Sequence, residues 1–202
     1  MPTDLKSKYL QLRHVSTILR DEGGYELGSG ECNPVIFQEF IGEVLDLDFP
    51  PYIWEPFAGH SGQNTNMDYC LGIGGIFLMA QDIRPSDPRV MTGDSTKEGP
   101  PNRPYGMFFH PPYFGAPCFS DSEGEISLID DMAKYMRLLS KTITLANLHE
   151  GGLACAVCRA YRHGGKIVDL PMMFLEIFAE SDYDLVGVWS SEPDIALIMR
   201  KL

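Results

Sequence analysis

The stretch Tyr105-Gly-Met-Phe-Phe-His-Pro-Pro-Tyr-Phe-Gly115 decides the fold of this chain. Residues 105–109 have the apolar character of a buried strand, and they run directly into His110, two prolines and an aromatic residue. Proline cannot donate to a sheet ladder and disfavours helix at the residue before it, so Pro111 and Pro112 end the strand and keep the backbone extended. We expect a strand end at a ligand site, with the proline carbonyls free to face the ligand.

Outward from this stretch, predicted strands alternate with predicted helices until a final pair of strands. This alternation favours an α/β fold with a mostly parallel sheet, and the turn-rich segment at residues 190–193 predicts an antiparallel hairpin at the C-terminus. Together with 105–109, we expect strands at 52–55, 75–82, 89–94, 151–159, 183–189 and 194–199, and helices at 34–47, 64–71, 125–148 and 171–179.

The N-terminal region is predicted to be an appendage to this domain. The apolar spacing of residues 4–20 suits a helix, which Gly23-Gly24 would end. We therefore divide the 202 residues into an N-terminal helix and linker at 1–33 and one domain at 34–202.

Charge limits the classes of partner. The chain has 28 acidic and 16 basic side chains and a formal net charge of −12, whereas proteins that grip duplex phosphates usually carry the opposite balance. The charge leaves three possibilities open: nucleic-acid binding through a basic patch at Arg159, Arg162 and Lys166, binding with the help of a partner subunit or homodimer, or a small substrate. No apolar run approaches the roughly 20 residues of a membrane span, and we expect a cytoplasmic protein with no membrane association.

Five cysteines are scattered along the chain. Cys155-Ala-Val-Cys158 has the spacing of redox and zinc motifs, but no second pair of ligands completes a four-ligand site. We predict that both are core residues of a strand, that structural disulfides are absent, and that the chain has no metal site.

Polar residues follow several predicted strands. Glu55 precedes a glycine turn, Asp82 and Asp94 end the next two strands, and His110 ends the fourth. Ligands of open α/β sheets bind at the carboxyl ends of the strands, and an acid there can accept hydrogen bonds from a ribose. The pattern favours a nucleoside-bearing cofactor, although Asp82 and Asp94 could also be ordinary turn acids.

Two of these segments carry a family resemblance. Glu55-Pro-Phe-Ala-Gly-His-Ser-Gly62 resembles the cofactor turn of the S-adenosylmethionine-dependent DNA amino-methyltransferases, which act on adenine N6 or cytosine N4. Phe109-His-Pro-Pro-Tyr113 resembles their catalytic motif, and residues 151–166 are similar to the strand and basic turn after their long helix. The resemblance covers about residues 34–202 and implies a Rossmann-like methyltransferase fold with helices on both sheet faces.

The resemblance also implies functions for single residues. His110 and the Pro111 carbonyl would accept hydrogen bonds from the target amino group, Pro112 would complete the motif, and Tyr113 would stack on the target base. Asp82 would bind the ribose hydroxyls of S-adenosyl-L-methionine and Asp94 its adenine amine. The other cofactor-binding residues would be Glu55, Pro56, Phe57, Ala58, Gly59 and Gly62.

Two departures from the family keep alternatives open. His110 stands where the family has Asp, Asn or Ser, and no stretch is long enough for the family's separate target-recognition region. A neutral imidazole has one acceptor nitrogen and can act as a general base. The sequence thus predicts a methyltransferase that modifies nucleic acid, such as DNA. The alternatives are a methyltransferase for a protein amide or small molecule, and a catalytically silent binding subunit.

Overall fold

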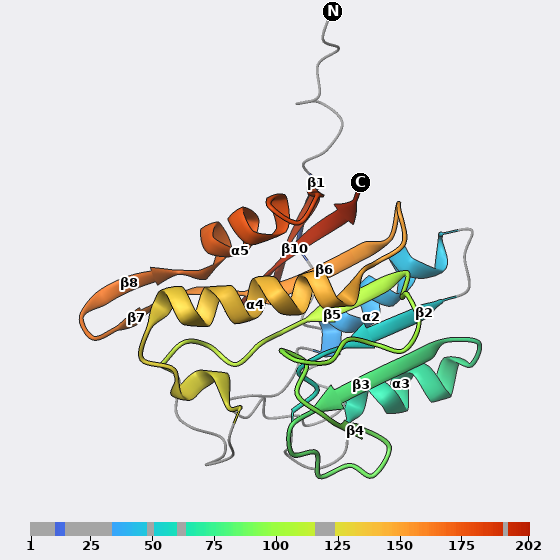
Figure 1. Ribbon diagram of the computed structural model, residues 1–202. Coiled ribbons are helices and arrows are strands. Elements are labelled where there is room, and N and C mark those ends of the chain that lie inside the picture. Colours follow the sequence, from blue (N-terminus) through green and yellow to red (C-terminus); the bar gives the residue numbers. More distant parts are fainter. Residues whose placement is uncertain (1–10, 15–33, 48–50, 60–63, 116–123, 192–193) are drawn as a thin grey trace, which may run out of the picture.

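The computed structural model describes residues 11–14, 34–47, 51–59, 64–115, 124–191 and 194–202 (Figure 1). Its centre is an eight-stranded sheet in the order β1-β9-β10-β6-β5-β2-β3-β4. All neighbours pair in parallel except β10, which is antiparallel to both β6 and β9. The strands are β1 (Gln11–His14), β2 (Tyr52–Glu55), β3 (Phe77–Asp82), β4 (Met91–Thr92), β5 (Gly106–Phe109), β6 (Leu153–Cys158), β9 (Tyr183–Ser191) and β10 (Asp194–Lys201).

Helices cover both faces of the sheet and bury two separate apolar clusters (Figure 1). One face packs against α4 (Met132–Ala146) and α5 (Leu170–Ala179), and the other against α2 (Pro34–Leu45) and α3 (Thr65–Ile73). Alternation along β5 supplies both clusters, because neighbouring side chains of a strand point to opposite faces. The Phe108 ring lies 5.0 Å from that of Phe37 on α2, and the Phe109 ring lies 5.5 Å from that of Phe174 on α5.

The chain reverses its direction of sheet growth between β2 and β5. From β2 the next two strands, β3 and β4, add on one side, and the chain then returns to place β5 on the other side of β2. Ile53 pairs with Gly106 and Trp54 with Met107 in this central parallel ladder. The carboxyl ends of β2 and β5 therefore leave the sheet next to each other.

The predicted α/β architecture is confirmed: the sheet is mostly parallel, the C-terminal hairpin is antiparallel, and the topology is compatible with a Rossmann-like fold. The seven strands predicted for the domain are present, and β1 adds an eighth by pairing in parallel with β9. The helix predicted over residues 4–20 is wrong at Gln11–His14, because backbone pairing with the sheet edge fixes these residues as β1. The rest of that prediction lies outside the described residues.

The long helix predicted over residues 125–148 is interrupted. A 3₁₀ turn, η2 (Ile126–Leu128), comes first, and α4 starts only at Met132. Between them the Asp131 carboxylate accepts the Lys134 N–H and caps α4, a pattern that satisfies one of the unpaired N–H groups at a helix start. Among the described helices none is both long and apolar enough to cross a membrane.

A second hairpin replaces the basic turn that the sequence predicted after β6. It consists of β7 (Ala160–His163) and β8 (Lys166–Asp169), which pair in an antiparallel ladder. Gly164 and Gly165 join them with φ values of 56° and 78°, the two successive positive values of a type I′ turn. Figure 1 shows this hairpin extending away from the sheet and helices.

Replacement of Phe108 by alanine tests the central packing. Phe108 is 0% exposed between β5 and α2, so Phe108→Ala should lower the free energy of unfolding by about 3–5 kcal/mol. Phe77→Ala is the matched control, since that ring is 66% exposed and its loss should cost well under half as much. Urea unfolding of both variants measures the difference, and equal costs would contradict this description of the core.

Candidate functional site

The turn after β2 is tied to the end of β3. The Gly59 N–H donates to Oδ2 of Asp82 at 3.0 Å, and the Ala58 N–H donates to the Gln81 carbonyl at 3.0 Å. Gly59 has a φ of 78°, a value that glycine adopts without strain. Oδ1 of Asp82 accepts the Arg84 N–H at 2.9 Å. Asp82 therefore shapes the turn through both oxygens of its carboxylate, a group that has about four acceptor positions.

The segment after β4 lies beside the same carboxyl ends of the strands. The Gly93 N–H donates to the Asp82 carbonyl at 2.9 Å, and the Ser95 hydroxyl donates to the carbonyl of Pro56. These bonds bring Asp94 to the turn that follows β2. The structure thus gathers Glu55 to Gly59, Asp82 and Asp94 at one edge of the sheet.

Asp94 also holds its own turn. Its Oδ1 accepts the Thr96 hydroxyl at 2.6 Å and the Thr96 N–H at 3.0 Å, and its Oδ2 lies 3.0 Å from the Lys97 ammonium. Burial alone would raise the pKa of this carboxyl, but the hydrogen bonds from Thr96 and Lys97 outweigh burial and lower the pKa. Asp94 is therefore a carboxylate at neutral pH and keeps its capacity as an acceptor.

Glu55 is a buried acid within an asparagine cluster. Its side chain is 1% exposed, and its oxygens accept Nδ2 of Asn66 at 2.6 Å and Nδ2 of Asn64 at 3.4 Å. Asn64 also caps α3, since its Oδ1 accepts the Met67 N–H at 2.7 Å. The buried Oδ1 of Asn66 has no donor among the described residues. Because buried acceptors are rarely unpaired, a donor from a bound water or ligand is expected at this oxygen.

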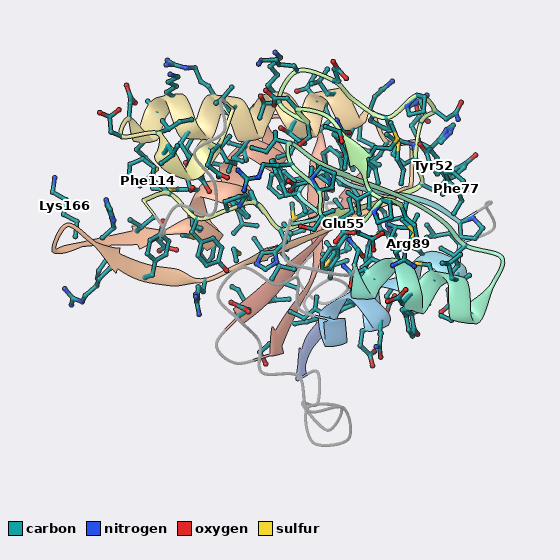
Figure 2. All side chains as sticks on the ribbon, turned by 90° about the horizontal axis from the view of Figure 1, so that it is seen from below. Tyr52, Glu55, Phe77, Arg89, Phe114 and Lys166 are labelled. Carbon is teal, nitrogen blue, oxygen red and sulfur yellow. The ribbon has the colours of Figure 1, made fainter. Side chains whose placement is uncertain are left out.

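Side-chain ion pairs and hydrogen bonds hold the start of α3 in place. Oδ2 of Asp87 accepts the Asn64 N–H at 2.8 Å, and Arg89 bridges Asp87 and Asp68 with N···O distances of 2.6 Å each. Hydrogen bonds from Arg89 and Asn64 hold the pKa of Asp87 well below its usual range. Figure 2 shows Arg89 beside α3 and Glu55 near the centre of the molecule. This network fixes the position of the asparagines that hold Glu55.

His110 follows β5 and lies next to the turn after β2. The Phe57 and Phe109 rings are 5.6 Å apart, so the two chain segments are in contact where they leave the sheet. His110 is half-buried and its ring is 6.0 Å from that of Tyr113. Burial lowers the pKa of His110; nearby Arg159 lowers it further, and Asp194 opposes both effects. The imidazole is therefore neutral at pH 7 and has one acceptor nitrogen.

The two proline carbonyls differ. The Pro112 carbonyl accepts the hydroxyl of buried Tyr135 at 2.9 Å, so the prediction of a free carbonyl is wrong for Pro112. None of the described residues donates a hydrogen bond to the Pro111 carbonyl. Tyr135 thus holds the motif in place from α4 and leaves the Pro111 carbonyl available.

Tyr113 has three neighbours from distant parts of the chain. Tyr161 stacks on its ring with centroids 5.5 Å apart and an interplanar angle of 15°, and the Arg159 guanidinium carbon lies 5.3 Å from the ring centroid. The Tyr113 hydroxyl donates to Oδ1 of Asp194 at 3.3 Å. Burial, with Asp194 next in effect, raises the pKa of Tyr113, so the hydroxyl stays protonated and can donate.

Strand β7 continues along the motif. The Tyr161 hydroxyl donates to the Phe114 carbonyl at 2.6 Å, and the His163 ring lies 5.5 Å from the Phe114 ring. Gly115 has a φ of 63°, and a Cβ there would lie 2.2 Å from the His163 ring. A larger residue at this position would require the His163 ring to move, so the projecting hairpin is packed directly against the segment that follows the prolines.

Most of the predicted site residues come together. His110 to Tyr113 and the cofactor candidates Glu55, Pro56, Phe57, Ala58, Gly59, Asp82 and Asp94 lie at the carboxyl ends of β2 to β5, whereas Gly62 lies outside the described residues. Cys155 and Cys158 are fully buried in β6, as predicted. Within the ranges that the structure describes, no cluster of three or more His, Cys, Asp or Glu side chains has the arrangement of a metal site.

Sequence reasoning missed Tyr161, Asp194, Tyr135 and Asn66 as neighbours of the site. Asp194 lies 81 residues from Tyr113, and no local pattern indicates such a contact. Tyr161 could have been found, because Gly164-Gly165 between two short polar–apolar segments is a hairpin signal.

Comparison with known proteins leaves the family open. No family model matches the sequence, and no significant match is found among curated proteins.

Titration of His110 tests the electrostatics of this site. Its folded-state pKa should lie below the ordinary value of 6.5. As the pH falls, the unfolded chain therefore takes up a proton on His110 before the folded chain does, and the free energy of unfolding decreases below pH 6.5. NMR titration of the imidazole protons, assigned by their loss in His110→Gln, measures the pKa. Asp194→Asn should lower it further, and Arg159→Gln should raise it. A wild-type pKa above 6.5, or the opposite shifts, would contradict this environment.

Proposed function

We propose that this protein is an S-adenosylmethionine-dependent methyltransferase that acts on an exocyclic amino group of a nucleic-acid base, adenine or cytosine. The observation that carries the proposal is the meeting of the Glu55–Gly59 turn with the His110–Tyr113 segment where β2 and β5 leave the sheet. Ligands of open α/β sheets bind at such reversals of strand order. The antiparallel C-terminal hairpin of β9 and β10 also agrees with the fold that the resemblance implies.

The groups at this edge fit the cofactor. Glu55, Asp82 and Asp94 are acids, and Asn66 has an unpaired buried oxygen. Such acceptors suit a ligand whose polar groups are an ammonium, two ribose hydroxyls and an adenine amine. Glu55 with Asn66 would hold the ammonium, Asp82 the ribose and Asp94 the amine. When bound, S-adenosylmethionine supplies a methyl group on a positively charged sulfur.

The motif after β5 supplies the groups that would orient the target. The Pro111 carbonyl and one nitrogen of the neutral His110 ring can each accept a hydrogen bond from an amino group. These hydrogen bonds would raise the electron density on the amino nitrogen and orient the nitrogen toward the methyl group. Both effects are catalysis by positioning and charge placement. His110 can also take up the proton that the nitrogen releases as its bond to carbon forms.

A second candidate is a catalytically silent subunit that binds the cofactor. The stacking of Tyr161 on Tyr113 favours it, because a ring that already contacts a neighbour offers less of its surface to a base. The net charge of −12 also leaves a protein amide or a small molecule as possible methyl acceptors. Transfer measurements separate these candidates from the first.

Calorimetric titration with S-adenosylmethionine tests the cofactor assignment. The wild-type protein should bind, and Asp82→Ala should weaken binding by at least about tenfold, since charge-assisted hydrogen bonds contribute roughly 1.5–3 kcal/mol each. Asp184→Ala removes the same charge from an exposed position at the start of β9 and serves as the control. Absence of binding at millimolar cofactor would sink the methyltransferase proposal.

Replacement of His110 tests the transfer step. His110→Ala should reduce methyl transfer by about 100-fold or more, the usual contribution of a positioned acid–base group, while cofactor affinity stays within a few-fold. His110→Asn, which restores an acceptor that the related family uses, should recover part of the activity. Mass spectrometry of nucleosides from DNA and RNA incubated with labelled cofactor gives the rates. Full activity of His110→Ala would remove the imidazole from the mechanism.

A further inference from the structure

The β7–β8 hairpin has a charge opposite to that of the whole chain. Between Arg159 and Asp169 there are three cations and one acid, in a chain with 28 acidic and 16 basic residues. The one acid is engaged, because the Asp169 carboxylate caps α5 by accepting the Met172 N–H at 3.3 Å. A projecting hairpin with net positive charge is therefore attached to an acidic protein.

The hairpin has an inner and an outer face. Tyr161 pairs with Val168, which is buried, whereas Arg162 pairs with Ile167, which is 67% exposed. Cross-strand partners share a face and neighbours alternate, so Arg162 and Ile167 point away from the core. Lys166 lies at the far tip of the hairpin in Figure 2.

Arg162 on the outer face and Lys166, which pairs with His163 beside the Gly164-Gly165 turn, are free within the described part of the chain. Neither Arg162 nor Lys166 makes an ion pair or hydrogen bond there with its side chain. By contrast, Arg89 and Lys97 near the cofactor candidates are paired with carboxylates. A charged side chain without a partner on an exposed ribbon is suited to a ligand of opposite charge.

The inner face connects the hairpin to the site. Arg159, Tyr161 and His163 alternate along the chain and contact the segment from Tyr113 to Gly115. A ligand held by Arg162 and by Lys166, whose cross-strand partner is His163, would therefore be bound to the same element that contacts the segment after β5. Movement of β7 would also shift the ring of Tyr161 relative to that of Tyr113.

We propose that the β7–β8 hairpin is the substrate-binding element of this protein: Arg162 and Lys166 bind the phosphodiester backbone of a nucleic acid and bring its target base to Tyr113. The inference rests on the proposed function and supplies the grip that the acidic chain otherwise lacks. A two-stranded ribbon is narrow enough to enter a nucleic-acid groove. Tyr161, stacked on Tyr113, is then a positioning residue for the ring that meets the base.

Oligonucleotide binding by a charge-neutral hairpin tests the proposal. Fluorescence anisotropy with labelled single-stranded DNA, duplex DNA and single-stranded RNA of equal length would be measured over a range of salt concentrations. Arg162→Gln/Lys166→Gln should weaken binding about tenfold or more at low salt and reduce the magnitude of the salt slope by between one and two, as for two lost phosphate contacts. Arg137→Gln/Lys141→Gln makes the same change of charge on exposed positions of α4 and should have little effect.

The outcomes separate this inference from the function on which it rests. Unchanged binding by the hairpin variant, an equal loss in the α4 control, or no binding of any oligonucleotide by the wild type overturns the inference. A wild type that binds S-adenosylmethionine but no oligonucleotide keeps the cofactor assignment. If the wild type binds oligonucleotide through the hairpin but does not bind the cofactor, the inference about the hairpin is supported and the methyltransferase proposal is overturned. The oligonucleotide that binds most tightly identifies the type of nucleic acid that supplies the phosphates. An unchanged affinity of the hairpin variant for the cofactor shows that this variant is folded.

Discussion

The parallel pairing of β2 with β5 is the constraint on which the site depends. It places two segments that are about 50 residues apart side by side at the point where the order of strands reverses. The Phe57 and Phe109 rings, 5.6 Å apart, continue this contact beyond the ladder. Both strands are buried on both faces by helices, so the ends of the strands are the places where polar groups can gather without breaking the core.

Several side chains at the carboxyl ends of these strands have both a structural role and a proposed functional role. Asp82 holds the Gly59 turn and Asp94 holds its own turn, yet a carboxylate has enough acceptor positions for both a backbone N–H and a ligand. The His110 ring is kept neutral by burial and by Arg159, which makes it an acceptor where a charged imidazolium would be only a donor. Preorganisation by the protein's own hydrogen bonds is thus compatible with ligand binding.

The sequence predicted the strands of the sheet and the position of the polar strand ends, because these follow from local apolar runs, prolines and glycine turns. It did not predict β1 at Gln11–His14, whose strand conformation comes from pairing with β9 and not from its own residues. The break before α4 and the Asp194–Tyr113 contact were missed for a related reason: a capping acid is a weak signal, and the contact joins residues far apart in the chain. The β7–β8 hairpin carried a readable Gly-Gly signal, but its basic residues were interpreted as a turn.

A crystal structure with S-adenosylhomocysteine tests the central claim most directly, because it locates the cofactor relative to both segments. The account predicts the ribose hydroxyls on the Asp82 carboxylate, the amine of the adenine near Asp94, and the sulfur facing His110 and the Pro111 carbonyl. Ligand bound elsewhere, or bound with its sulfur turned away from His110, would contradict the account.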